Sequence, residues 1–433
     1  MEIIRLPTTQ KRTYQRDEHN ISRENISENA LKVLYRLKNA NFDAYLVGGG
    51  VRDLLLEREP KDFDIATNAT PEEVRSLFRN CRLIGRRFRL AHVHFGAEII
   101  EVATFRGQHD GNNGDEGQIV DGMIVRDNVY GTIEEDAWRR DFSVNSLYYN
   151  INNFAVEDFV GGLADLKARR LRILGDPEQR YQEDPVRMLR AVRFAAKLDF
   201  SIEKETEAPL FQLGSLLEGV PPARLFEEVL KLFLSGHAVK TFELLRHYHL
   251  FPFIFPQTEA SIKENSGGKT LELVKRALEN TDQRVSEGKP VTPAFIFAVF
   301  LWDPVSSLNA KYLERGMGES QTLSAAAEAV VSGQSRRVSI PRRFHSPMRE
   351  MWMLQERLVK RAPRRSLRLL QHPRFRAAYD FLLLRADAGD VDPELASWWT
   401  ELIQADDEGR TEIIDRLSRG RRQFKRRRKP RAK

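Results

Sequence analysis

The chain is almost without cysteine, because Cys81 is the single thiol among 433 residues. One cysteine can form neither an intramolecular disulfide nor a zinc site with several thiolates, and we interpret Cys81 as a packed structural residue. No apolar run approaches the roughly 20 residues that a bilayer-spanning helix needs. Residues 1–29 are polar and charged and lack the apolar centre of a secretory signal. These absences predict a cytoplasmic protein without a transmembrane segment.

The positive charge of the chain is unevenly distributed. Residues 419–433 hold ten lysines and arginines and no acid, and since the whole chain has a formal net charge of +7, residues 1–418 carry −3. A block of like charges repels itself, so we expect a disordered tail that favours polyanions, RNA above all. The alternative is a tail that only improves solubility.

A second basic stretch lies in the predicted late helices. It comprises Arg342, Arg343, Lys360, Arg361, Arg364, Arg365, Arg368, Arg374 and Arg376. Phe344 and Phe375 are interleaved with these residues, and their rings would suit stacking on RNA bases. The alternative is a solvated basic face with both aromatic side chains in the core.

The apolar pattern divides the chain into a mixed head and a helical remainder. Strand and helix signals alternate in residues 31–175, whereas helical periodicity prevails in residues 185–198, 221–235, 238–248, 293–302 and 345–386. We therefore predict an α+β fold, with an α/β nucleotidyltransferase-like head around a small mixed sheet and an all-helical neck, body and tail. The predicted parts are a flexible extension (1–30), the catalytic head (31–175), the neck with nucleotide recognition (176–250), the helical RNA-binding body (251–418) and the basic tail (419–433).

Two capping boxes mark helix starts within the head. Thr70 and Glu73 frame the first, and Thr132 and Glu135 frame the second, which we expect to open a helix that runs through Tyr148. A threonine at the N-cap and an acid three residues later satisfy backbone N–H groups that the helix itself leaves without partners.

The other local signals of the head are strands and one loop. Residues 44–47, 91–95 and 98–104 predict strands, and the last two are expected to flank the strand that carries Asp64. Residues 107–122 contain five glycines without periodicity and predict a mobile loop. His109 in this loop has no partner residues nearby in the sequence, and we interpret it as incidental.

The most informative stretch is Asp62-Phe63-Asp64-Ile65. In a strand, alternate side chains point to opposite faces, so both aspartates would project one way while Phe63 and Ile65 enter the core. Two carboxylates on a rigid strand suit Mg²⁺, which is usually held by one or two carboxylates plus substrate phosphates. The alternative is an exposed acidic pair on an edge strand.

A glycine turn precedes these aspartates. Gly48 and Gly49 would let backbone N–H groups approach a triphosphate, and Arg52 at the start of the following helix would bind its oxygens. The alternative for Arg52 is an ion pair within its own helix. Together, the turn and the aspartates predict phosphoryl chemistry on a nucleotide.

Four motifs occur in order: Gly48-Gly49-Gly50-Val51-Arg52-Asp53, Asp62-Phe63-Asp64, Arg139-Arg140-Asp141-Phe142-Ser143-Val144-Asn145 and Glu183-Asp184-Pro185-Val186-Arg187-Met188-Leu189-Arg190. This series resembles the class II tRNA nucleotidyltransferase/poly(A) polymerase family, most strongly over residues 40–250. Within the family, residues 83–93 (LIGRRFRLAHV) resemble the segment that marks bacterial poly(A) polymerases rather than CCA-adding enzymes. Residues 372–380 and the basic tail resemble the same group.

The resemblance implies an enzyme that adds AMP from ATP to RNA 3′ ends without a template, with Mg²⁺ as its metal. Implied substrates are mRNAs and small RNAs, and RNA-decay proteins are implied as partners. The near alternative is a CCA-adding enzyme with the same site. An alternative of another class is a non-catalytic RNA-binding protein that acts through its tail, which would need none of the acids of the motifs.

The resemblance also assigns roles. Asp62 and Asp64 would hold the metal, Asp141 would be catalytic, and Glu101 would be a third carboxylate, preferred over Glu98 by strand parity. The remaining motif residues would bind the nucleotide: Gly48, Gly49, Arg52, Asp53, Arg139, Arg140, Asn145, Asp184, Arg187 and Arg190.

Base recognition follows from the chemistry of Asp184 and Arg187, three residues apart on one predicted helix. A carboxylate accepts a hydrogen bond from an exocyclic amine, which adenine and cytosine have at positions where guanine and uracil have oxygen. The pair would therefore select ATP and CTP but could not separate them. The alternative is that Asp184 only caps the helix that Pro185 begins. His92 and His94 alternate on a strand without a third ligand, so we predict no metal site there.

Overall fold

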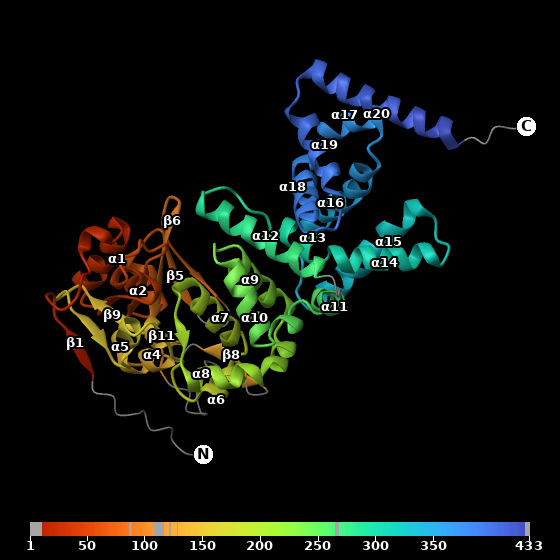
Figure 1. The fold of residues 1–433 in the computed structure, drawn as a ribbon. Coiled ribbons are helices and arrows are strands. Elements are labelled where there is room, and N and C mark those ends of the chain that lie inside the picture. Colours follow the sequence, from red (N-terminus) through yellow and green to blue (C-terminus); the bar gives the residue numbers. More distant parts are fainter. Residues whose placement is uncertain are drawn as a thin grey trace, which may run out of the picture. The chain divides into compact units, whose positions relative to one another are not determined.

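The computed structural model describes residues 11–85, 89–107, 117–120, 123–127, 129–264 and 268–428. The chain divides into two compact units, Met1–Leu216 and Leu217–Lys433, and Figure 1 shows sheet and helices in the first and helices in the second. Each unit is described by itself below.

A mixed eight-stranded sheet forms the centre of the N-terminal unit. Its strands are β1 (Arg12–Tyr14), β2 (Ala44–Val47), β3 (Asp64–Thr67), β4 (Cys81–Ile84), β5 (Leu90–Phe95), β6 (Glu98–Thr104), β9 (Leu147–Asn150) and β10 (Val156–Asp158). They follow the order β1-β10-β9-β2-β3-β6-β5-β4, in which β3 and β6 are parallel and the other neighbours are antiparallel. The predicted α+β fold with a small mixed sheet is confirmed.

The N-terminal unit also contains helices, some of which pack on this sheet. They are α1 (Glu28–Asn39), α2 (Gly49–Leu55), α3 (Pro71–Leu77), α4 (Ile133–Arg139), α5 (Gly162–Lys167), α6 (Pro177–Glu183), α7 (Val186–Leu198) and α8 (Lys204–Glu207). Helix α1 packs on β2, β3 and β6, and α2 packs on β2 and β9. The face that α1 buries repeats at helical spacing, with Ala30, Val33, Leu34 and Leu37. The turn from β2 into α2 thereby comes to lie beside the start of β3, where Val47 pairs with Asp64.

The sheet has a buried and a more open face around β3, β6 and β5. Ile65, Val102 and Ala91 are in register on these strands and are buried. Their neighbours in sequence point to the other face, which carries Asp64 and Glu101. The predicted strands at 91–95 and 98–104 are thus present, although only β6 borders β3 and β5 lies one strand further out.

Both predicted capping boxes are present, but the second helix is much shorter than expected. Thr70 caps α3 and Thr132 caps α4, each with its reciprocal glutamate. Helix α4 ends at Arg139, the next residue is extended, and β9 begins at Leu147. Pairing of β9 with β2 and β10 buries its aromatic side chains. This long-range pairing outweighs the local helical signal that predicted a helix through residue 148.

Residues 11–30 are not a flexible extension, contrary to our prediction. Strand β1 pairs with β10 at the edge of the sheet, and the Tyr14 side chain is buried. Ser22 and Ser27 then cap a short 3-10 helix and α1. A segment without an apolar pattern of its own becomes ordered because it completes the hydrogen bonds of a sheet edge.

Most of the predicted loop at 107–122 lies outside the described residues. Residues 117–120 within it form β7 (Gly117–Val120), which pairs antiparallel with β8 (Met123–Asp127). At least this part of the predicted loop is therefore a strand.

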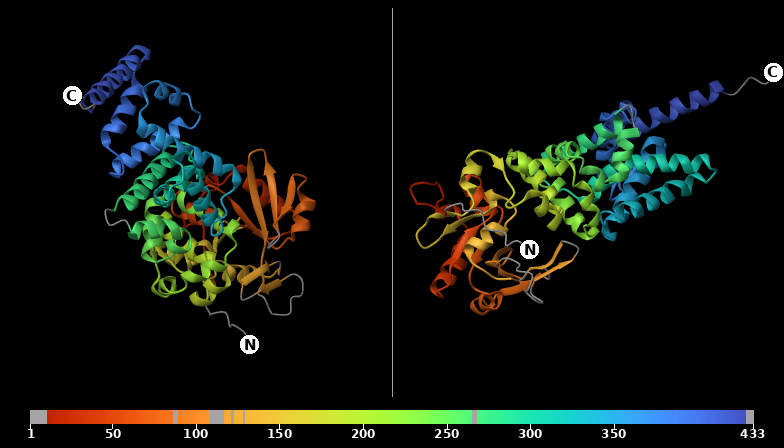
Figure 2. Two further views of the ribbon diagram at one scale, coloured as in Figure 1. Left: turned by 90° about the vertical axis from the view of Figure 1, so that its right-hand side faces the viewer. Right: turned by 90° about the horizontal axis from the view of Figure 1, so that it is seen from below.

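The described residues of the C-terminal unit are helical, as predicted. Its helices are α9 (Pro222–Phe233), α10 (Ala238–His247), α11 (Pro256–Glu264), α12 (Lys269–Ser286), α13 (Pro293–Phe300), α14 (Trp302–Glu314), α15 (Glu319–Ser335), α16 (Arg342–Lys360), α17 (Pro363–Leu370), α18 (Phe375–Asp387), α19 (Pro393–Gln404) and α20 (Asp407–Arg428). Helices α14 and α15 pack side by side as a hairpin (Figure 2). Across the described residues, no single helix meets the length and apolarity of a membrane span, and α13 with α14 does so only as a pair bent by 50°.

The aromatic side chains of the basic stretch face inward. Phe375 is 7% exposed and stacks on Tyr379 beside Trp399 in a hydrophobic core. Phe344 lies against Phe226. This corrects the prediction that Phe375 is available to stack on RNA bases, because apolar burial between α16, α18 and α19 holds its ring.

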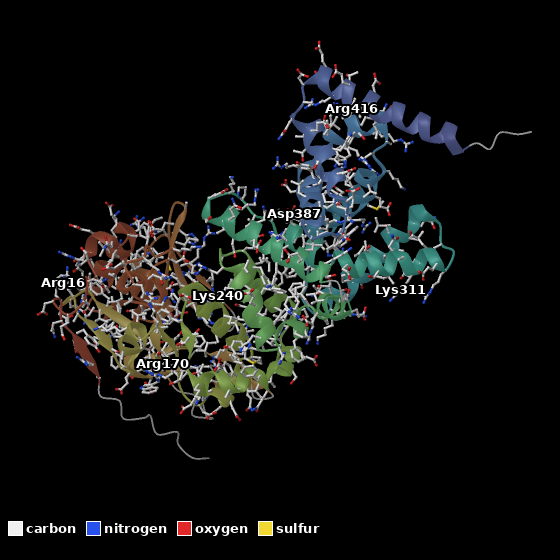
Figure 3. All side chains as sticks on the ribbon, in the orientation of Figure 1. Arg16, Arg170, Lys240, Lys311, Asp387 and Arg416 are labelled. Carbon is white, nitrogen blue, oxygen red and sulfur yellow. The ribbon has the colours of Figure 1, made fainter. Side chains whose placement is uncertain are left out.

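The basic tail is helical over its first part, which corrects the prediction of disorder from residue 419. Helix α20 continues to Arg428, and residues 429–433 lie outside the described residues. Ile413 and Ile414 anchor this helix in the core. Arg416, which Figure 3 labels on this helix, pairs with Glu401 at 3.3 Å. Arginine is a good helix former, so a helix anchored at one end can extend through an arginine run.

Candidate active site

The two aspartates of the Asp-x-Asp motif lie at the start of β3. Asp64 is its first residue and is half-buried, whereas Asp62 precedes the strand and is exposed. Asp64 stands opposite Glu101 of β6 in the parallel register. The other acid of β6, Glu98, accepts hydrogen bonds from side chains of the N-terminal segment instead. The structure therefore brings together Asp64 and Glu101, the acid that strand parity selected.

The carboxylates of Asp62 and Glu101 act electrostatically on Asp64, so a cation bound among them would stabilise their charged forms. Burial raises the pKa of Asp64 to about 6, the charges of Glu101 and Asp62 add to this rise, and Arg140 opposes it. A bound cation would favour the charged form of such a carboxylate. Among the described residues, no three His, Cys, Asp or Glu side chains converge as a complete metal site. Mg²⁺ can take two carboxylates and complete its shell with water and phosphates, so Asp62 and Asp64 fit this ion.

The glycine turn passes directly beside Asp64. Gly48 has a φ of +74°, and α2 begins at the next residue. A Cβ atom on Gly48 would lie 3.6 Å from Asp64 Oδ2 and 3.6 Å from Arg140 Nη1. Glycine adopts this φ without strain and lets the backbone come this close. The turn that we predicted to bind phosphates thus shares one location with the acids.

Arg52 is buried beneath this turn rather than exposed on it. Its side chain is 2% exposed and donates hydrogen bonds to Asp53 Oδ1 at 2.8 Å and to Asn145 Oδ1 at 2.6 Å. Lys197 Nζ lies 3.5 Å from Asp53 on its other side. We predicted that Arg52 contacts the triphosphate. Its partners in the structure are Asn145 and Asp53, and the pair with Asp53 agrees with the alternative of an ion pair within its own helix, while contact with the triphosphate stays a prediction.

The two arginines at the end of α4 differ in their surroundings. Arg139 donates to the backbone carbonyl of Gly107. Arg140 donates to Asp136 Oδ2 and to the Tyr148 hydroxyl, both at 2.9 Å, and its Nη1 atom faces the glycine turn. Of the two, only Arg140 is therefore placed beside Asp64.

Asp141 and Asn145 do not share a helix face, because α4 ends at Arg139. They meet in the turn that follows, where Asn145 Nδ2 donates to Asp141 Oδ1 at 3.2 Å. Arg190 Nε donates to Asp141 Oδ2 at 2.7 Å. Burial by itself would raise the pKa of Asp141, but Arg190, Asn145 and the N–H of Phe142 outweigh it and hold the pKa at about 2. Asp141 therefore stays ionised at neutral pH.

Asp141→Asn is expected to lower the free energy of unfolding by about 2 kcal/mol at pH 7, because a pKa held near 2 stabilises the folded chain once the carboxylate is ionised. That stability is present above the ordinary aspartate pKa and is lost as the pH falls from about 4 to 2. Urea unfolding of both proteins across this range measures it. Equal stability at pH 7 would contradict the assignment.

Asp184 and Arg187 lie where α6 meets α7. Asp184 is the C-cap residue of α6 and has an extended backbone, whereas Pro185 has helical dihedral angles at the start of α7. The backbone N–H of Arg187 donates to the carbonyl of Asp184, so the alternative that Asp184 caps the second helix stays a prediction. The Asp184 side chain is 9% exposed. Arg187 Nη1 donates to the carbonyl of Arg180 at 2.7 Å and to Glu183 Oε2 at 2.9 Å. The pair sits on one short segment, and its role in base recognition stays a prediction.

Two charged residues brace this region: the sequence predicts Asp136 as the partner of Arg140 in a helix-stabilising pair, and the pair is present, whereas the sequence does not predict Arg180. Asp136 is 1% exposed and binds both Arg140 and Tyr148. Arg180 donates to the carbonyls of Arg139 and Arg140, each at 2.9 Å, and so ties α6 to the end of α4. The spacing of four residues between Asp136 and Arg140 was a usable signal, whereas nothing local marked Arg180.

Three family models match the chain. They are the Poly A polymerase head domain over residues 44–172, the probable RNA and SrmB-binding site of polymerase A over residues 199–262, and the polymerase A arginine-rich C-terminus over residues 315–433. Poly(A) polymerase I of Salmonella typhimurium is 51% identical over 394 residues, which cover 89% of this chain and 84% of the relative.

CCA-adding enzymes are similar at lower identity. The enzyme of Lactobacillus helveticus is 36% identical over 245 residues, 56% of this chain and 57% of the relative. The solved Thermotoga maritima CCA-adding enzyme, complexed with tRNA, shares the fold at a TM-score of 0.57 and 21% identity, over 91% of this chain and 87% of that one. With half of its residues identical to a poly(A) polymerase along most of its length, this chain belongs to the bacterial poly(A) polymerases of the tRNA nucleotidyltransferase family.

Proposed function

We propose that this template-independent adenylyltransferase uses the start of β3 as its catalytic centre. ATP is the nucleotide, Asp62 and Asp64 are the Mg²⁺ ligands, and the 3′ ends of mRNAs and small RNAs are the acceptors. The observation that carries this proposal is the meeting of Asp64, Glu101 and the Gly48 turn at one end of the sheet. Phosphoryl transfer from a nucleotide requires carboxylates that can hold the metal ion and a backbone turn that can come close to the phosphates.

The reaction joins the RNA 3′ oxygen to the α-phosphorus of ATP and releases pyrophosphate. When bound, Mg²⁺ would stabilise the negative charge that develops on the attacking and leaving oxygens. Glu101 lies beside Asp64 and would accept the proton of the 3′-hydroxyl. The backbone at Gly48 and Gly49 would receive the phosphates, with Arg140 as the neighbouring positive charge.

The nucleobase would be recognised at the junction of α6 and α7. Asp184 would accept from the exocyclic amine of adenine, and Arg187 would donate to the adjacent ring nitrogen. Arg180 and Glu183 support this segment, because they bond to the α4 end and to Arg187 respectively. Guanine and uracil present an acceptor where Asp184 needs a donor, so GTP and UTP would be rejected. The family match named for a probable RNA- and SrmB-binding site supports RNA as substrate and SrmB as a protein partner.

Incorporation of each of the four labelled nucleotides tests this proposal, on an unstructured RNA and on a tRNA that lacks its 3′ end. Long products from ATP alone, with Mg²⁺ and on both RNAs, are expected. Short products that need both CTP and ATP and form only on the tRNA would instead identify a CCA-adding activity.

Removal of residues 419–433 is expected to weaken RNA binding while single-turnover incorporation on saturating RNA is preserved. Each phosphate that the tail contacts on a single strand contributes roughly 0.7 to the slope of log affinity against log salt concentration. A variant with glutamine at the ten basic positions keeps the length and should behave like the deletion. The measurement is the RNA affinity of each protein over a series of salt concentrations. An unchanged slope of log affinity against log salt concentration would contradict a direct role for the tail in RNA binding.

A further inference from the structure

A row of polar side chains crosses four strands, from Asp64 to the edge of the sheet. In register, Asp64 stands opposite Glu101, Glu101 opposite His92, and His92 opposite Arg82. Side chains directly opposite each other on neighbouring strands lie on the same face and interact. His92 thus lies on the side of Glu101 away from Asp64.

His92 makes a defined contact with Glu101. The His92 Nε2 atom lies 3.2 Å from Glu101 Oε2. A carboxylate in its charged form only accepts hydrogen bonds, so in such a pair Nε2 would be the donor. The His92 side chain is 20% exposed, whereas that of Glu101 is 41% exposed. The less exposed histidine side chain therefore forms a hydrogen bond with the more exposed glutamate side chain.

Glu101 needs such a contact to stay in place. Its side chain has several rotatable bonds, and ordering a glutamate costs up to roughly 2 kcal/mol of rotamer freedom. Its negative neighbour Asp64 would repel it toward solvent. A donor that binds Oε2 on the far side opposes both effects and leaves Oε1 for the RNA hydroxyl.

We propose that His92 is a positioning residue, which holds Glu101 beside Asp64 in the orientation that accepts the proton of the RNA 3′-hydroxyl. The proposal rests on the proposed role of Glu101.

His92→Ala should lower kcat for AMP incorporation by about tenfold or more. Losses of this size are typical when a residue that orients a functional side chain by a hydrogen bond is removed. The KM values for ATP and RNA should stay unchanged, because neither substrate binds through His92. His92→Gln retains an N–H donor and should recover most of the lost rate. His94→Ala removes the next histidine on the same strand face and should have the activity of the unaltered chain.

A double-mutant cycle with Glu101→Gln separates positioning from other roles. If His92 acts through Glu101, the double variant is no slower than Glu101→Gln alone. Independent losses that multiply, or a raised KM for RNA, would show that His92 acts elsewhere and would overturn the proposal. A loss of rate in His92→Ala that matches the fraction of protein unfolded at the assay temperature, as given by its melting curve, would also overturn it.

Failure of the proposal for His92 can be distinguished from failure of the proposed function. Full activity of Glu101→Gln would remove the basis for His92 as a positioning residue, yet it would leave Asp62 and Asp64 as metal ligands. Loss in Glu101→Gln with full activity in His92→Ala would confirm the third carboxylate and refute its positioning by His92.

Discussion

Asparagine in place of Asp64 is expected to reduce the rate of AMP incorporation by at least about a thousandfold, which corresponds to about 4 kcal/mol of transition-state stabilisation. The change keeps the size of the side chain but removes one of the two carboxylates that would hold Mg²⁺. Asp62→Asn is expected to act in the same way. The two effects should not add, because the remaining carboxylate alone cannot hold the ion in place.

The measurement is single-turnover incorporation from ATP at saturating RNA, over a series of Mg²⁺ concentrations. RNA affinity should be largely retained, because the positive tail lies in the other unit of the chain. Glu72→Gln is the matched control: it removes an exposed carboxylate that pairs with Arg89 on the same unit and should not alter the rate. Retained incorporation in Asp64→Asn would refute the assignment of the metal site.

Alanine in place of Asp184 is expected to reduce the preference for ATP over GTP by about 10- to 100-fold, the discrimination of one well-placed pair of hydrogen bonds. Most of this change should come from a lower kcat/KM for ATP, since the acceptor for the adenine amine is lost. Asp184→Asn adds a donor for the guanine oxygen, so it should also raise incorporation from GTP. Arg187→Gln should weaken use of ATP and CTP alike.

Values of kcat/KM for the four nucleotides on one RNA measure this effect. Glu178→Ala removes an exposed acid from the same helix α6 and serves as the control, with unchanged preference expected. If Asp184→Ala lowers the rates with all four nucleotides by the same factor, the residue supports the fold of the α6–α7 junction and does not select the base.

Local chemistry was sufficient to predict several parts of this protein. The threonine–glutamate caps of α3 and α4 depend only on residues three positions apart. The parity of β6, which separates Glu101 from Glu98, depends only on the alternation of side chains along a strand. The order of four motifs was enough to predict the family. In each case the determining contacts lie within a few residues, or the pattern itself carries the information.

Long-range packing decided the rest. The helix expected to run through Tyr148 stops at Arg139 because β9 finds hydrogen-bonding partners in β2 and β10, residues distant in sequence. Arg52 is buried because Asn145, 93 positions away, supplies an acceptor. Residues 12–14 become a strand only because β10 presents an edge. A charged or polar side chain takes its role from the partners that surround it, and those partners are assembled only when the chain has folded.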